Sequence, residues 1–230
     1  MPEPAAKKIA IVAALEREVR PLVKNWRVSE QEYDGRRFRI FENNDVVLIC
    51  GGIGSVPARR AAEAVIALFT PAKVYSVGFA GALDPHLKIG DVLRPRKVIN
   101  AADCSSTSMN EGDGVLVSFG SVASPEQKRK LQESFAAQAV DMEAAAVLRA
   151  AEARQIGFAA IKAISDESNF VFPSTERFID SDGNFLEGQF ALFAAMRPWL
   201  WPRTLRLAQN SRRASRALCA SLAELCNPGN

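Results

Sequence analysis

The hydrophobic positions of the chain fall into short continuous runs that alternate with longer amphipathic segments. The runs Ile9 to Leu15, Val74 to Val77 and Phe158 to Ile164 are typical of strands buried on both faces of a sheet. Between such runs, Pro57 to Phe69 and Met142 to Ile156 have the apolar spacing of helices packed on one side. Alternating strands and helices predict an α/β fold.

Further elements follow from turn and capping signals. Arg37 to Phe41 and Val46 to Cys50 are predicted to be two strands joined by the turn Asn43-Asn44-Asp45. The segment Ser124-Pro125-Glu126 has the composition of a helix N-terminus. We also expect strands at Asp91 to Val98 and Val115 to Phe119, and a polar loop over residues 100–114.

Composition narrows the class of protein. With 48% hydrophobic residues among 230, the chain can bury a core, and a net charge of +3 gives no indication of nucleic-acid binding. The four cysteines form no C-x-x-C motif, and with His86 as the only histidine we expect no metal site. Since neither a secretory signal nor a long apolar span is visible, we expect a cytoplasmic protein.

Glycines and acids follow the predicted strands. The segments Gly51-Gly52-Ile53-Gly54 and Gly78-Phe79-Ala80-Gly81 come directly after apolar runs, and Ser165-Asp166 ends another. Taken singly, the glycines fit ordinary turns and the acids fit helix starts. Neither G-x-G-x-x-G nor G-x-x-x-x-G-K-[ST] occurs, so a dinucleotide or P-loop site is not indicated.

Taken together, these segments predict one site, because ligands of open α/β sheets bind at the carboxyl ends of strands. Three acids, Glu18, Glu143 and Asp166, would meet there beside close-approach glycines. Cleavage of a glycosidic bond is a reaction that carboxylates perform without a metal, histidine or cysteine.

The same segments carry a resemblance to a known family. The chain resembles the nucleoside phosphorylase superfamily, and its pattern is most similar to the methylthioadenosine/S-adenosylhomocysteine nucleosidases. The motifs are IAIVAALEREV, GGIGSV, VGFAGALDPHLKIGDV, AVDMEAAAV and KAISDE, in order from Ile9 to Glu167. The resemblance implies a single-domain, doubly wound mixed sheet flanked by helices, and cleavage of the N-glycosidic bond of a purine nucleoside, a 5′-substituted adenosine. It also implies a homodimer.

The resemblance also implies roles for individual residues. Asp166 is similar to the general acid that protonates purine N7, and burial in the apolar strand would raise its pKa. Glu143 corresponds to the acceptor of the ribose 2′ and 3′ hydroxyls, with Met142 against the sugar. Glu18, rather than Glu16, corresponds to the residue that activates water. The other substrate-binding positions implied are Phe79, Gly78, Ala80, Gly52, Val122, Ala123 and Ser165.

Departures from the family pattern bear on the nucleophile. Phe79 stands where many phosphorylases have a small polar residue that holds phosphate, which favours water, although Arg17, Arg59 and Arg60 leave phosphate open as a co-substrate. No other cofactor is implied. A phosphate-dependent phosphorylase and a nucleoside-binding protein without catalysis remain alternatives. The loop from Ala102 to Gly114 is shorter than in typical nucleosidases.

The C-terminal residues 188–230 differ from the α/β domain expected over residues 1–187. They are arginine-rich, and a helix there would place Leu207, Ala214, Leu218, Leu222 and Leu225 on one stripe. This tail resembles that of the phosphorylase-like proteins associated with hopanoid synthesis, which act on an adenosyl group attached to a lipid. Two interpretations stay open: a helix packed on its own domain, or a basic amphipathic helix in peripheral contact with a membrane.

Overall fold

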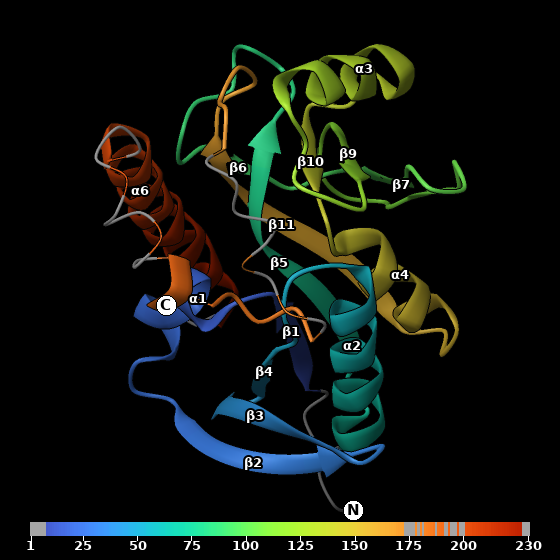
Figure 1. The fold of residues 1–230 in the computed structure, drawn as a ribbon. Coiled ribbons are helices and arrows are strands. Elements are labelled where there is room, and N and C mark those ends of the chain that lie inside the picture. The colour runs from blue at the N-terminus through green and yellow to red at the C-terminus, as the bar shows by residue number, and fades with distance from the viewer. Residues whose placement is uncertain are drawn as a thin grey trace, which may run out of the picture.

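A computed structural model describes residues 8–172, 178, 180, 182–186, 188–190, 193, 197 and 201–226 (Figure 1). The strands are β1 (Ile9–Ala13), β2 (Arg27–Tyr33), β3 (Arg36–Asn43), β4 (Val46–Cys50), β5 (Lys73–Ala82), β6 (Val92–Leu93), β7 (Lys97–Asn100), β8 (Ser106–Ser108), β9 (Val115–Ser118), β10 (Ala139–Asp141) and β11 (Gly157–Asp166). The helices are α1 (Glu16–Val23), α2 (Ser55–Phe69), α3 (Pro125–Phe135), α4 (Ala144–Glu152) and α6 (Trp201–Cys226).

The long strand β5 organises one mixed sheet. Its first half lies between β1 and β11, both parallel to it, and its last residues pair with the antiparallel β10. The remaining strands extend the sheet on either side, in the order β2-β3-β4-β1-β5-β10-β9-β7-β8. The carboxyl ends of β1, β5 and β11 therefore meet at one edge, which is where ligands of such sheets bind.

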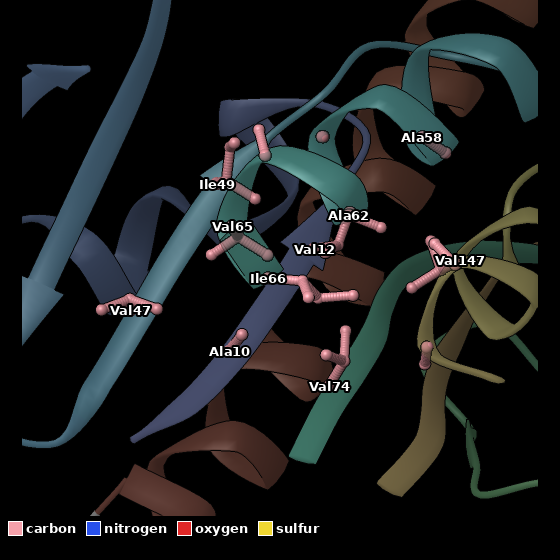
Figure 2. Close-up of a cluster of buried hydrophobic side chains, with 14 of the residues drawn as sticks. Ala10, Val12, Val47, Ile49, Ala58, Ala62, Val65, Ile66, Val74 and Val147 are labelled. Atoms are coloured by element: carbon pink, nitrogen blue, oxygen red, sulfur yellow. The ribbon is translucent and has the colours of Figure 1, made fainter. Parts of the chain in front are cut away.

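Helices cover both faces of the sheet. In β1, Ala10 and Val12 pack with α2 and α4 on one face, while Ile11 and Ala13 pack with α1 and α6 on the other. Figure 2 shows the first of these clusters, with Val65 and others from α2 lying against the strands. Because successive strand residues point to opposite faces, a strand buried on both sides is continuously apolar, as the sequence predicts for this segment.

The C-terminal helix α6 belongs to the second face. Its buried residues Ala214, Leu218 and Leu222 join the cluster formed by β1, β5, β11 and α1, and Figure 1 shows α1 and α6 lying side by side. The predicted apolar stripe is thus occupied by packing within the chain. Residue 187, the expected domain boundary, lies outside the described residues. In the part of the chain that the structure covers, no helix is long and apolar enough to cross a membrane.

Local signals predict several elements well. Asn44, at a φ of 49°, lies in the two-residue turn between β3 and β4, where an asparagine tolerates the left-handed region. At the start of α3, the Ser124 backbone N–H donates to Oε1 of Gln127 at 2.8 Å, and Ser124 Oγ accepts from the Gln127 N–H at 3.3 Å. This capping box confirms the predicted helix start.

Other predictions are wrong in detail. The expected strand Asp91 to Val98 is two short strands, β6 and β7, separated by a segment containing Pro95, which lacks the N–H that a ladder needs. The expected loop 100–114 contains the short strand β8. The strand β2 was not predicted, because it is an exposed hairpin strand without an alternation of apolar and polar residues. Likewise, Gly78-Phe79-Ala80-Gly81 is part of β5 rather than a loop, since β11 pairs along it.

We predict that α6 contributes to the stability of the whole α/β unit. Replacing the fully buried Leu218 by alanine leaves a cavity and lowers the free energy of unfolding by about 2–5 kcal/mol. Leu205→Ala on the same helix, where the side chain is 62% exposed, changes it by less than about 0.5 kcal/mol. Urea denaturation measures both values, and an unchanged transition in Leu218→Ala would show that α6 unfolds independently.

Candidate active site

A cavity of about 900 Å³ opens at the carboxyl ends of β1, β5 and β11. Nine residues that the sequence assigns to the site line this cavity: Glu18, Phe79, Ala80, Val122, Ala123, Met142, Glu143, Ser165 and Asp166. They come from segments spread over most of the domain and meet because their strands end at the same edge. The three acids singled out in the sequence therefore share one cavity.

The two glycines Gly78 and Gly52 lie beside the cavity rather than on its lining. Gly78 has a φ of 144°, and a Cβ there would lie 3.0 Å from Oε2 of Glu18, so this glycine makes room for that carboxylate. Gly52 packs against the backbone of residues 182–183, where a Cβ would come within 2.6 Å of the Asp182 carbonyl oxygen. Gly52 therefore lies in the loop between β4 and α2, outside the cavity lining.

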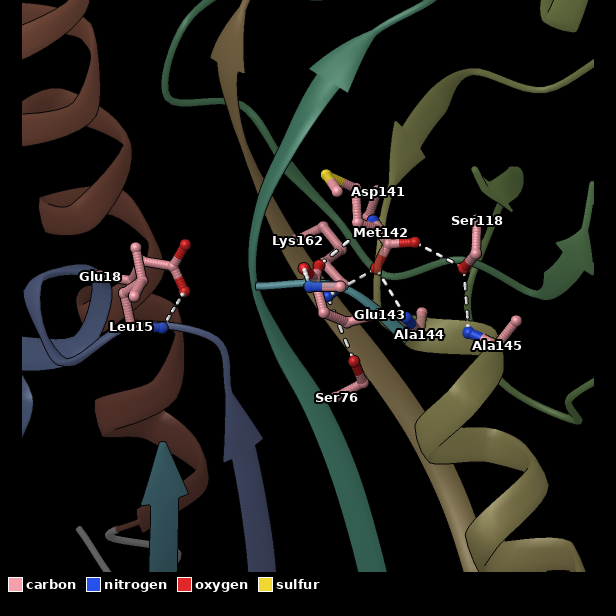
Figure 3. Close-up of polar contacts among 11 residues, drawn as sticks. Leu15, Glu18, Ser76, Ser118, Asp141, Met142, Glu143, Ala144, Ala145 and Lys162 are labelled. Atoms are coloured by element: carbon pink, nitrogen blue, oxygen red, sulfur yellow. Dashed lines mark hydrogen bonds and ion pairs between the residues drawn. The ribbon is translucent and has the colours of Figure 1, made fainter. Parts of the chain in front are cut away.

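The junction between β10 and α4 presents Met142 and Glu143 to the cavity. Asp141 accepts from Ser118 Oγ at 2.6 Å through Oδ1 and from the Ala144 N–H at 2.8 Å through Oδ2, and Ser118 Oγ also accepts from the Ala145 N–H (Figure 3). These bonds satisfy backbone groups at the start of α4 and delay the helix to Ala144, two residues later than predicted.

A buried lysine balances the acids at this junction. Lys162 of β11 is 1% exposed, and its Nζ lies 2.8 Å from Oδ2 of Asp141 and donates to Ser76 Oγ at 3.2 Å. Burial by itself lowers the pKa of this ammonium, but the charges of Asp141 and Glu143 outweigh burial and raise it above the usual value. Lys162 is therefore a permanent cation inside the domain, and it makes a group of buried carboxylates possible.

The carboxylate of Glu143 is held by backbone N–H groups and not by an ion pair. Its Oε1 accepts from the Gly54 N–H at 2.8 Å, at the N-terminus of α2, and its Oε2 accepts from the Met142 N–H at 3.2 Å. Burial, and next the charge of Asp141, raise the pKa of Glu143 to about 7, against the lowering effect of Lys162. The carboxylate form is thus available at neutral pH but loses charge under mild acid.

Glu18 is the second perturbed acid. It lies in the first turn of α1, it is 6% exposed, and the Leu15 N–H donates to its Oε2 at 3.3 Å. Burial raises the pKa of Glu18 above its ordinary value, although that hydrogen bond and the charge of Lys162 oppose the shift. Glu16 behaves differently, because it points outward to an ion pair with Arg39 at 2.6 Å.

Asp166 has a partner that sequence reasoning missed. Buried Lys128 of α3 donates to Oδ2 of Asp166 and, at 2.7 Å, to the carbonyl oxygen of Glu167, while Ser165 Oγ donates to Asp166 Oδ1 at 2.7 Å. The expectation that the apolar strand alone surrounds Asp166 is therefore incomplete. The Asp166 carboxylate is thus buried together with an ammonium and a hydroxyl that both contact it.

Backbone irregularity aims this acid. The pairing of β11 with β5 shifts by one residue between Ile164 and Asp166, so Ser165 is a bulge residue. The side chains of Ser165 and Asp166 are consequently both buried. Bulges commonly redirect side chains beside active sites. Gly81 completes the arrangement, because a Cβ there would lie 2.7 Å from Asp166 Oδ2 and 3.1 Å from Lys128 Nζ.

The two buried lysines differ in how far the sequence could reveal them. Lys162 interrupts the apolar run Phe158 to Ile164, and a charge inside a buried strand is a signal that it has partners. Lys128 stands in the basic segment Lys128-Arg129-Lys130 of an amphipathic helix, where nothing distinguishes it from its exposed neighbours. Among the described residues, no group of three or more His, Cys, Asp and Glu is arranged to hold a metal.

Comparison with known proteins identifies the family. The sequence profile of the Phosphorylase superfamily matches residues 8–122 and 113–186. This is well over half of the chain, and the chain therefore belongs to the Phosphorylase superfamily. The sheet and helices described above form the corresponding nucleoside phosphorylase-like fold, extended by the long helix α6.

Within this superfamily, the chain is similar to 5′-methylthioadenosine/S-adenosylhomocysteine nucleosidases. It is 36% identical to the enzyme of Marinomonas sp. over 96 residues, or 40% of this chain and 41% of that protein. It is 29% identical to the enzyme of Staphylococcus aureus over 199 residues, or 70% of this chain and 87% of that protein. The crystal structure of the Colwellia psychrerythraea nucleosidase in complex with adenine has a TM-score of 0.63 at 24% identity, covering 70% and 83% of the two chains.

The raised pKa of Glu143 predicts how stability depends on pH. Between pH 4.5 and 7 the folded protein binds more protons at this residue than the unfolded chain, so its contribution to the free energy of unfolding is lost as the pH rises through about 7. In Glu143→Gln this titration is absent. Relative to the variant, the wild type should lose about 2–3 kcal/mol between pH 5 and pH 8, measured by urea denaturation. Parallel pH profiles would contradict the assignment.

Proposed function

We propose that the protein cleaves the N-glycosidic bond of a purine nucleoside, a 5′-substituted adenosine, with water as the nucleophile. The observation that carries the proposal is the convergence of Glu18, Glu143 and Asp166 in one cavity, each in a different electrostatic environment. Nucleosidase relatives, one of them crystallised with adenine, support the choice of bond and base. The roles assigned to Asp166, Glu143 and Glu18 are part of this proposal.

Asp166 delivers a proton to N7 of the departing base. A purine anion is a poor leaving group, so the proton must arrive while the bond from C1′ to N9 breaks. Asp166 and Lys128 form an ion pair, in which the proton to be transferred is on the ammonium. Lys128 passes this proton to Asp166 as Asp166 protonates N7, so the pair is left as a carboxylate and a neutral amine. The amine of Lys128 takes a proton from solvent after the base leaves. Ser165 and the Glu167 carbonyl keep the two side chains aligned.

Glu143 acts on the sugar. Its carboxylate exchanges the N–H groups of Gly54 and Met142 for the ribose 2′ and 3′ hydroxyls, which lie on the same side of the ring. Positive charge develops on the sugar as the bond breaks, so a fixed negative charge beside it stabilises the transition state more than the ground state. Met142 lines the cavity next to Glu143 and supplies apolar contact to the ring.

Glu18 activates the nucleophile. Burial makes its carboxylate a stronger base than an exposed glutamate, and a base is most effective when its pKa approaches the operating pH. It takes one proton from water as the oxygen bonds to C1′, which yields free sugar and purine. Phe79 gives the cavity an apolar wall where a phosphate site would need donors, which supports hydrolysis over phosphorolysis.

Two further expectations stay predictions. A homodimer is expected from the resemblance to the nucleosidases. The cytoplasmic location is likewise an expectation from the sequence. The cavity volume of about 900 Å³ lies near the upper end of the range for small-molecule sites, so the cavity has room for 5′ substituents of different sizes.

We predict release of adenine from 5′-methylthioadenosine in phosphate-free buffer, at a rate that added phosphate does not raise. Asp166→Asn should lower kcat by about 10²- to 10⁴-fold, because the amide has no proton to give, while ligand affinity changes less. Chromatography of the base and calorimetry of binding make the measurements. Activity that requires phosphate would identify a phosphorylase, and binding without turnover in the wild type would identify a binding protein.

The role of Lys128 has a separate test. Lys128→Met should lower kcat, because Asp166 then loses its proton supply. Lys128→Arg keeps the positive charge but cannot give up a proton, so it should not restore the rate. Hydrolysis of p-nitrophenyl riboside, whose leaving group needs no proton, checks that both variants are folded. Full activity of Lys128→Arg on the nucleoside would limit Lys128 to an electrostatic role.

A further inference from the structure

Helices α1 and α6 both line the cavity, and several of their lining residues are exposed cations. The exposed basic residues that line it, here called the rim, are Arg17, Arg20 and Lys24 from α1 and its C-cap, and Arg212 and Arg216 from α6. Spacings of three and four residues put the three α1 cations on one side of that helix. Each of the two helices therefore contributes positive charge to the cavity lining.

The row on α6 continues into apolar residues. Trp201 and Leu205 precede Arg212 and Arg216 by multiples of a helical turn, so all four lie on one stripe of the helix. Trp201 is 50% exposed and Leu205 is 62% exposed, which is unusual for large apolar side chains. The α6 cations of the rim thus share one side of the helix with an exposed tryptophan and an exposed leucine that do not line the cavity.

Helix α6 is rich in arginine and poor in acids. Helix α6 contains five arginines and one acid, Glu224, whose carboxylate lies near Arg94. Within the described part of the chain, no carboxylate pairs with Arg20, Lys24, Arg212 or Arg216. The carboxylates of the cavity lie at its inner end, where Asp166 and Asp141 are paired with Lys128 and Lys162.

We infer that the rim of the cavity, formed by α1 and α6, docks on the surface of an anionic lipid bilayer. Basic side chains gain attraction from anionic head groups, and tryptophan and leucine gain burial at the interface. Nucleic acid fits less well, because an exposed leucine gains nothing from a phosphate backbone. The apolar stripe of α6 that packs inside the domain takes no part, so the contact differs from that of an ordinary amphipathic helix. This inference does not depend on the proposed reaction.

Co-sedimentation of the full chain with vesicles tests the inference. We expect binding to vesicles of phosphatidylglycerol and phosphatidylcholine, no binding to pure phosphatidylcholine, and release at high salt. The double variant Arg212→Gln, Arg216→Gln should weaken the partition coefficient roughly tenfold or more, since each basic residue near such a surface contributes roughly fivefold. Leu205→Ser should weaken it further.

The matched control is the double variant Arg37→Gln, Arg129→Gln. It removes the same charge from exposed positions on β3 and α3, outside the cavity lining, and should bind the vesicles like the wild type. Urea denaturation confirms that each variant is folded. Equal weakening in the control would reduce the effect to overall charge and overturn the inference, as would an absence of vesicle binding. Preferential binding of an RNA oligonucleotide that displaces the vesicles would also overturn it.

Discussion

The site depends on burying several carboxylates close together without leaving their charge uncompensated. Burial of an uncompensated carboxylate is costly, and the ammonium of Lys162 interacts with Asp141, Glu143 and Glu18 alike. Lys162 pairs directly with Asp141 and leaves Glu143 with backbone donors only. The cation therefore stabilises the group as a whole without occupying the carboxylate that faces the cavity. Asp141, which is ion-paired, and Glu143, which backbone N–H groups hold at the cavity, are separated by two positions in the chain.

The second pair repeats this arrangement with a different outcome. Lys128 contacts Asp166 itself, the residue that the proposed reaction needs as a proton donor. Unlike a guanidinium, an ammonium can both pair with a carboxylate and supply a proton to it, as the proposed reaction requires. Gly81 leaves space for both groups. Lys162 thus pairs with a neighbour of the acid that is proposed to bind the sugar, whereas Lys128 pairs with the acid that is proposed to give the proton.

Much of the fold could be predicted from local pattern, because strands buried on both faces and capped helices leave a direct trace in the sequence. The segment of β1 and the start of α3 are examples. The strand β2 left no trace because neither of its faces is well covered, and the extension of β5 through Gly78 and Gly81 depends on pairing with β11, which lies far along the chain. The site acids could be singled out because they follow strands. Lys128 could not, since its burial is decided by where α3 packs and not by its neighbours in sequence.

Helix α6 both contacts the buried acid Glu18 and lines the cavity. Its C-terminal half contributes Leu218 and Leu222 to the core beneath α1, which fixes the helix against the first turn that carries Glu18; Ser215 Oγ donates to the Glu18 carbonyl oxygen at 2.9 Å. Its N-terminal half passes the opening of the cavity and has no buried residue before Ala214. The same helix therefore holds a buried acid in place at one end and shapes the approach to it at the other. Helix α6 therefore connects the surface of the protein to its cavity.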